Sequence, residues 1–185
     1  MPKQLIAEME RKMKATLHDL ETDLGTLRTG RANPALLDRV MVEYYGTPTP
    51  LKQVANVTAP DARQILVTPW DKALAPQIAN AISRSDLGLQ GVRDGDAVRV
   101  SVPTLNEERR KEMVKMAAKK TEAHKLALRN IRRDANDSLK KLEKDGGLTK
   151  DDLQRYEGEV QKITDRLVAD ADKLRAAKEA DIMEV

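Results

Sequence analysis

The spacing of hydrophobic residues divides this chain into two kinds of sequence. Residues 3–28 and 104–183 carry apolar side chains at steps of three and four, which is the period of an amphipathic helix. The segment between them is punctuated by proline and glycine and alternates as strands do. The pattern therefore predicts a helical bundle with a second domain inserted into it.

Three long helices are expected in the flanking regions. The first carries a stripe of Ile6, Met9, Met13, Leu17, Leu20, Leu24 and Leu27. The second begins where Thr104 can cap the first amides and Glu107 can close a capping box, and it meets no glycine before Gly146, so it spans roughly 40 residues and about 60 Å. The third begins after the cap Thr149 and carries a stripe of Leu153, Tyr156, Val160, Ile163, Leu167 and Leu174. Burying the three stripes against one another gives a three-helix bundle.

The inserted segment is predicted to be a small α/β domain of the β-α-β type. Strands are expected at residues 40–45, 54–58, 63–68, 87–90 and 97–102, with a break at the proline-rich residues 46–50. Asp71 is placed to cap one short helix. The fold class is therefore α+β, with one domain formed by residues 1–30 and 104–185 and the other by residues 31–103.

Two chain crossings join these domains and are candidates for a hinge. They contain Thr29, Gly30 and Arg31 on one side and Val102, Pro103 and Thr104 on the other. Short crossings that bear glycine and proline can let one domain swing, although a fixed junction explains the same residues equally well.

Composition excludes several classes of function. The chain has no cysteine, and its two histidines, His18 and His124, do not suffice for a zinc site, so no metal or catalytic thiol is expected. His124 falls near the apolar side of the second helix, where a packed histidine is expected. A secretory leader, an apolar run long enough for a membrane span and a glycine-rich phosphate loop are all lacking in the sequence, which predicts a cytoplasmic protein that is not an enzyme and needs no cofactor.

Positive charge is concentrated on the second helix. Residues 104–146 carry 13 basic and 8 acidic residues, whereas the net charge of the whole chain is only +3. At 100° per residue, one sector of this helix, the basic strip, contains Arg110, Lys111, Lys115, Lys125, Arg129, Arg132, Arg133 and Lys140. A solvated helix face is the plain explanation. The preference for arginine instead favours bidentate contacts to the phosphates of a nucleic acid.

Four separated motifs then resemble one known family. They are RTGRANPALLD at residues 28–38, VEYYGTPTPL at 42–51, NEERRK at 106–111 and RNIRRDAND at 129–137. In order and spacing they resemble the bacterial ribosome recycling factor family over essentially the whole chain. Asn106 departs from the threonine that is common there.

The resemblance implies an L-shaped protein, with the bundle as one arm and the α/β domain as the other. It implies a monomer that binds the 70S ribosome after termination, mainly through rRNA of the large subunit, and that splits the subunits together with elongation factor G and GTP. The implied rRNA-binding residues are Arg28, Arg31, Arg110, Arg129, Arg132 and Arg133.

Alternatives remain for the site and for the function. Arg28 and Arg31 could instead form ion pairs at the junction, with Asp38 or Glu107 as partners. A coiled-coil adaptor or holdase chaperone would use exposed apolar residues near the tip of the bundle, where Leu148 and Tyr156 lie. A nonspecific RNA-binding rod would share the basic strip but would not need the second domain.

Overall fold

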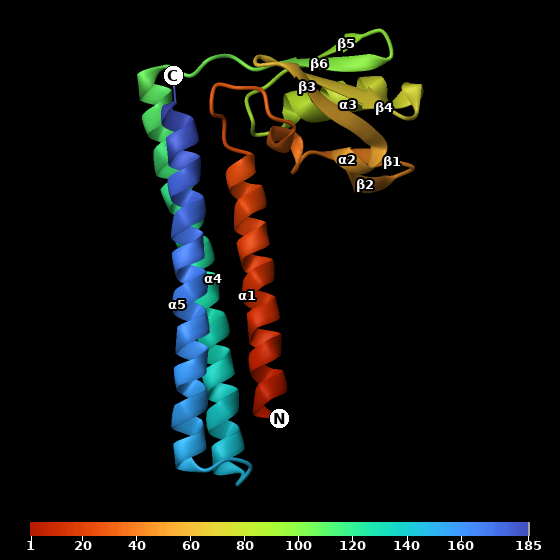
Figure 1. Cartoon of the computed structure of the whole chain (residues 1–185). Coiled ribbons are helices and arrows are strands. Elements are labelled where there is room, and N and C mark those ends of the chain that lie inside the picture. Colours follow the sequence, from red (N-terminus) through yellow and green to blue (C-terminus); the bar gives the residue numbers. More distant parts are fainter. Residues whose placement is uncertain (185) are drawn as a thin grey trace. The chain divides into compact units, whose positions relative to one another are not determined.

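The computed structural model describes residues 1–184 (Figure 1). Its long helices are α1 (Pro2–Gly25), α4 (Glu107–Lys144) and α5 (Lys150–Met183). Between α1 and α4 the chain forms β1 (Met41–Tyr44), β2 (Thr47–Pro50), α2 (Leu51–Val54), β3 (Ala55–Asp61), β4 (Gln64–Pro69), α3 (Ala75–Arg84), β5 (Gly91–Asp94) and β6 (Ala97–Ser101). The α+β fold class predicted from the sequence is confirmed.

Contacts divide the chain into two compact units, each of them discontinuous in sequence. Residues 1–24 and 116–179 form the bundle unit, and residues 25–115 form the second unit together with the C-terminal segment that begins at Ala180. The second unit contains the small α/β domain, both chain crossings and the start of α4.

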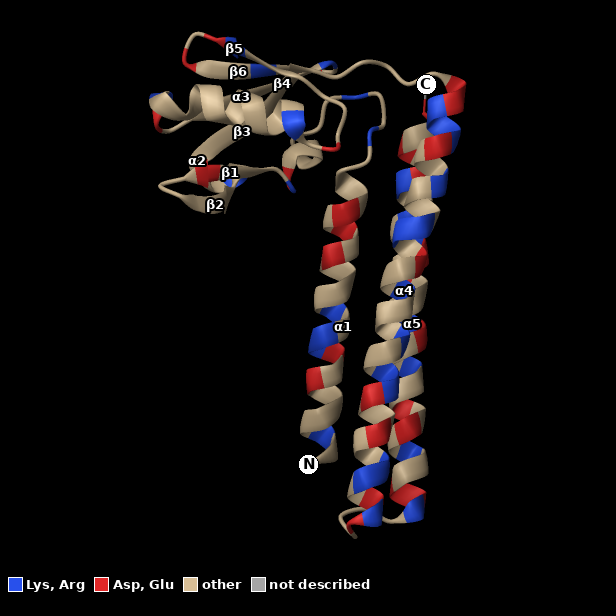
Figure 2. Cartoon of the chain, turned by 180° about the vertical axis from the view of Figure 1, so that it is seen from behind, with Lys and Arg blue, Asp and Glu red and all other residues tan. Residues whose placement is uncertain are grey.

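The bundle unit is held together by the stripes that the sequence predicts. One buried cluster joins Met9 and Met13 of α1, Leu128 and Leu139 of α4, and Val160 of α5, and four of these five side chains are fully buried. Burial of each such side chain contributes about 1.5–3 kcal/mol. In Figures 1 and 2 the three helices run side by side.

Of the two helix caps predicted from the sequence, one is confirmed and the other is not. The Oγ1 of Thr149 accepts a hydrogen bond from the Asp152 amide at 3.0 Å, so Thr149 caps α5 as predicted. The prediction that Thr104 caps the second helix was wrong. Instead, the Oδ1 of Asn106 accepts from the Arg109 amide at 2.8 Å, because α4 begins only at Glu107.

The small domain consists of a four-stranded antiparallel sheet, a separate hairpin and one packed helix. The sheet order is β3-β4-β6-β5, so β4 and β5 run parallel with β6 between them, and the connection through α3 makes a split β-α-β unit. Helix α3 packs against β5, β6 and β1. The core contains Ile65 and Val67 of β4, Ile78 of α3 and Val98 of β6, all fully buried.

Two strand predictions failed for physical reasons. The strand predicted at 87–90 lies at Gly91–Asp94 instead, because Gly88 has a φ of +68° and Gly91 lies so close to α3 that a Cβ there would be 3.1 Å from Ala79. Strand β2 was missed because it contains Pro48 and Pro50. These residues are tolerated because β2 pairs only with β1 in a two-stranded hairpin and therefore keeps one unpaired edge.

Candidate nucleic-acid interface

The arginines of the bundle unit that were predicted to bind RNA lie in the middle of α4. Arg129 and Arg133 are exposed, and Arg132 is half-buried. Among residues 1–184, none of the three has an acidic side chain within ion-pair distance. Figure 2 shows that basic residues recur along the length of α4. These guanidinium groups therefore keep their charge available for an external anion.

Arg132 is oriented by a neutral partner. Its Nη1 donates to the Oε1 of Gln161 on α5 at 3.3 Å, and Gln161 in turn donates through Nε2 to Asp165 Oδ1 at 2.8 Å. An amide can restrict a guanidinium without neutralising it, and most of the five N–H donors of Arg132 stay unused. Gln161 could not be singled out from the sequence, because only the packing of α5 against α4 brings it to Arg132.

Part of the predicted basic strip is engaged in ion pairs. Lys125 lies 3.1 Å from Asp172 and 3.4 Å from Glu122, and its side chain is only 13% exposed. It therefore links α4 to α5, and its assignment to an exposed strip was wrong. Lys111 is exposed but lies 3.7 Å from Glu107, one turn earlier in α4.

A further polar contact joins α4 to α1. The Nε2 of His124 lies 3.3 Å from Asp23 Oδ2, and its Nδ1 lies 2.8 Å from the Lys120 carbonyl oxygen. The imidazole is largely buried, as expected from its position on the helix. Within residues 1–184 no group of three or more acidic, histidine or cysteine side chains is arranged to hold a metal ion.

At the junction, Arg28 is buried and has no counterion among residues 1–184. The residue is 8% exposed, and its Nε has no hydrogen-bond partner within the part of the chain that the structure describes. Burial lowers the pKa of Arg28 from its usual value, and the positive charge of nearby Arg109 lowers it further. Two neighbouring cations with no carboxylate from the described residues between them make a site that an anion would stabilise. Arg109 was not among the predicted rRNA-binding residues, although it stands directly before Arg110 in the same motif.

The other junction arginines differ from Arg28. The Nη2 of Arg31 lies 3.2 Å from Glu184 Oε1, so Arg31 is ion-paired, but with neither Asp38 nor Glu107. Both groups are more than half exposed, and such a pair contributes little to stability. Arg110 is partly exposed and has no ion-pair partner among the described residues.

The predicted hinge residues adjoin two backbone contacts to the small domain, and Val102 itself makes one of them. The Ala32 amide donates to the Ala62 carbonyl, and the Val102 amide donates to the Arg63 carbonyl, both at 2.7 Å. Gly30 has a φ of +81°, which is strained for other residues. Pro103 and Thr104 are exposed.

Exposed arginines without acidic partners among residues 1–184, carried on a long helical scaffold, are typical of a protein that binds the backbone of a nucleic acid. Comparison with known proteins identifies the class more closely. The sequence profile of the family described as ribosome recycling factor matches residues 20–183. The chain belongs to the ribosome recycling factor family, and it is accordingly a non-enzymatic factor of protein synthesis that acts in ribosome recycling.

Individual relatives are similar in sequence to this chain over its full length. The chain is 49% identical to the ribosome-recycling factor of Brevibacillus brevis and 52% identical to that of Exiguobacterium sibiricum, with complete coverage of both chains in each case. A solution structure of a ribosome recycling factor matches all of this chain and 98% of its own, at 35% identity and a TM-score of 0.75.

A second solved structure comes from a ribosomal complex. It is described as models for the T. thermophilus ribosome recycling factor and the E. coli elongation factor G bound to the E. coli post-termination complex. The matched chain is 48% identical, both chains are covered completely, and the TM-score is 0.67. Membership of this family rejects the coiled-coil adaptor. Consistently, Tyr156 is buried in the bundle and Leu148 packs against the same cluster, so neither offers a client surface.

In the part of the chain that the structure describes, none of the helices combines the length and the apolar character needed to cross a bilayer.

Proposed function

We propose that this chain binds the 70S post-termination ribosome through rRNA of the large subunit and, with elongation factor G and GTP, separates the subunits in the cytoplasm. The relative seen on a post-termination complex with elongation factor G supports this assignment of partners. The proposed rRNA-binding residues are Arg28, Arg31, Arg110, Arg129, Arg132 and Arg133.

The main support for this function is the exposure of the arginines on α4 and their lack of acidic partners among the described residues. Arg129 and Arg133 are exposed and have no acidic partner in the described chain, and Arg132 is held by the uncharged Gln161. A structural arginine would be expected to face a carboxylate, as Arg166 faces Glu10 in the same bundle. Guanidinium groups that are oriented but not neutralised suit the phosphates of an RNA backbone.

The junction contributes a second phosphate-binding site in this proposal. Burial of the unpaired Arg28 beside Arg109 costs free energy in the isolated protein, because a desolvated charge lacks compensation. A bound phosphate would offset this cost. Arg31 would lose its exposed ion pair with Glu184 on binding RNA, and this loss costs little free energy.

The two crossings act as a hinge in this mechanism. Thr29, Gly30 and Arg31 on one strand and Val102, Pro103 and Thr104 on the other would absorb the change in backbone angles. The hydrogen bonds of Ala32 and Val102 to the small domain support hinge motion at the residues next to them, Arg31 and Pro103. The bundle resists bending through its continuous core, so force applied by the GTPase to the small domain would be transmitted to the rRNA contacts.

The test is subunit splitting followed by light scattering on post-termination ribosomes. We expect splitting only when the protein, elongation factor G and GTP are all present. Ribosome binding without splitting under any combination of these components would reject the proposed function and leave an RNA-binding rod.

A further inference from the structure

One contact between α4 and α5 places an arginine against a neutral amide. The Nη1 of Arg132 donates to the Oε1 of Gln161 at 3.3 Å. Where Arg166 of α5 meets α1, by contrast, its partner is the carboxylate of Glu10. A cation that only joins two helices gains attraction from an opposite charge, which an amide does not provide. The amide of Gln161 therefore indicates a role other than joining α4 to α5.

The orientation of this amide is fixed by Asp165, which lies one helical turn after Gln161 on α5. The Nε2 of Gln161 donates to the Oδ1 of Asp165 at 2.8 Å. A carboxylate can only accept, so it holds the NH₂ end of the amide toward itself and thereby turns Oε1 toward Arg132. A reversed amide would place its N–H donors against those of the guanidinium. Asp165 thus orients Arg132 through the amide, and no ion pair forms between Asp165 and Arg132 in the described chain.

The contact leaves Arg132 ordered and still charged. It uses one of the five N–H donors of the guanidinium, and the group has lost part of its freedom before any ligand binds. Ordering a long side chain only on binding lowers affinity by about 2- to 12-fold. Arg129 and Arg133 have no side-chain partner within residues 1–184, so Arg132 is the member of this motif that is positioned in advance.

We propose, resting on the rRNA contact of α4 proposed above, that Gln161 is a positioning residue for Arg132. Its Oε1 holds the guanidinium in the direction of an rRNA phosphate, and the amide, in place of a carboxylate, leaves the positive charge of Arg132 whole. Asp165 is the third member of this arrangement and keeps the amide in the required orientation. Gln161 acts through Arg132 and does not itself contact the RNA.

Two substitutions of Gln161 separate position from charge. Gln161→Met keeps the length of the side chain but removes the acceptor. Gln161→Glu keeps an acceptor but places a negative charge against the guanidinium. Gln161 is exposed, and methionine and glutamate have helix propensities close to that of glutamine, so the thermal midpoint of unfolding should stay near that of wild type in both variants.

The first readout is equilibrium binding to vacant ribosomes over a range of salt concentrations. We expect Gln161→Met to bind about 2- to 12-fold more weakly with the salt slope unchanged, because the number of cations is unchanged. Gln161→Glu should bind at least about tenfold more weakly and lower the slope by about one, because Arg132 is then neutralised. A merely structural role of Gln161 would change the thermal midpoint and leave the salt slope of Gln161→Glu as in wild type.

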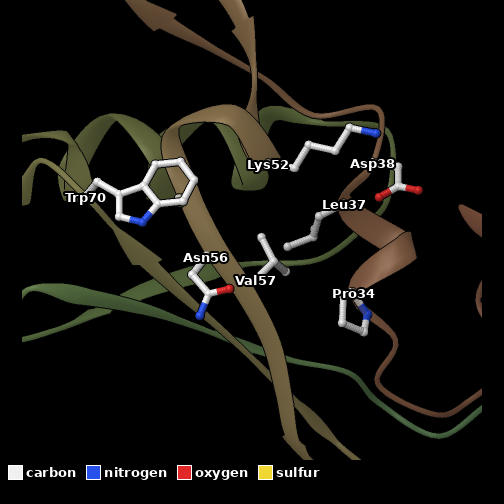
Figure 3. A pocket seen from close by; sticks show the side chains of 8 residues that line it. Pro34, Leu37, Asp38, Lys52, Asn56, Val57 and Trp70 are labelled. Carbon is white, nitrogen blue, oxygen red and sulfur yellow. The ribbon is translucent and has the colours of Figure 1, made fainter.

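Controls remove amides that hold no cation. Gln4 of α1 is exposed and its side chain has no hydrogen-bond partner in the part of the chain that is described, so Gln4→Met and Gln4→Glu repeat both changes on another helix of the bundle unit. In the small domain, Figure 3 shows the amide of Asn56 at a hollow that Trp70 also lines. Asn56→Ala removes this exposed amide from the second unit. All three control variants should bind as wild type does.

A double variant distinguishes positioning from direct contact. In an Arg132→Ala background, Gln161→Met should cause no further loss of affinity, because a positioning residue has no effect once its target is gone. A full additional loss would show that Gln161 contacts the rRNA itself and would overturn the proposal. The proposal is equally overturned when Arg132→Ala weakens binding but Gln161→Met and Gln161→Glu both match wild type.

The second readout is made on the free protein. Nuclear magnetic relaxation of the arginine Nε–H groups should show Arg132 more restricted than Arg129 in wild type and equally mobile in Gln161→Met. Equal mobility of the two arginines in wild type overturns the positioning role. Neither readout requires subunit splitting. A wild-type protein that binds ribosomes without splitting them therefore rejects the proposed function, while the variants of Gln161 still decide this inference.

Discussion

Replacing Arg132 with alanine tests the link between the geometry of α4 and RNA binding. The substitution removes a guanidinium that is half-buried and makes one hydrogen bond, at 3.3 Å, to the neutral Gln161. In the free protein, losing this hydrogen bond should lower the free energy of unfolding by about 0.5–1.5 kcal/mol. The buried seam of the bundle, which includes Leu128 and Leu139, is untouched.

The loss of binding free energy on the ribosome should be larger than the loss in free energy of unfolding. A hydrogen bond from a charged donor to phosphate contributes about 1.5–3 kcal/mol, which corresponds to roughly a 10- to 150-fold weaker affinity. One fewer phosphate contact should also lower the slope of log affinity against log salt concentration by about one.

The assay is equilibrium binding to vacant ribosomes at several salt concentrations, with unfolding of the free protein measured alongside. Arg166→Ala is the control, because it removes the same charge from α5 where the guanidinium is paired with Glu10. We expect the control to bind nearly as wild type does. An Arg132→Ala protein with unchanged affinity and unchanged salt slope would refute the assignment of Arg132 to phosphate binding.

Three further predictions concern stability. Asn106→Ala should lower the free energy of unfolding by about 1 kcal/mol, whereas Thr104→Ala should change it by less than about 0.5 kcal/mol, because Asn106 caps α4; chemical denaturation of both variants checks this. Leu139→Ala should cost about 2–5 kcal/mol in the same assay, since its side chain is fully buried in the bundle, and a cost under about 1 kcal/mol would contradict that burial. Hydrogen bonding to Arg166 lowers the pKa of Glu10 below its ordinary 4.5, so the stabilisation is present above that value and is lost as pH falls toward the lowered pKa. Thermal unfolding should therefore separate wild type from Glu10→Gln at pH 7 and bring them together in acid.

Much of the helical architecture follows from local pattern. The buried stripes of α1, α4 and α5 were predictable because a period of 3.6 places residues such as Met9 and Met13 on one face, whatever the partner. The cap of α5 was predictable for a similar reason, since Thr149 and the amide that it accepts from are three residues apart. The arginine motifs were visible in the sequence too, because residue type and spacing alone mark candidates for phosphate binding.

The properties that depend on distant partners were decided by the tertiary structure. Arg31 meets Glu184 across 153 positions, Lys125 meets Asp172 across 47, and Arg132 meets Gln161 across 29. No local periodicity encodes such pairs, so the sequence showed which residues are basic but not which of them are neutralised. The positive φ of Tyr45 likewise arises only when β1 pairs with β2. Residue charge and hydrophobic period can be read along the chain, whereas side-chain burial and ion pairing depend on how the folded elements pack together.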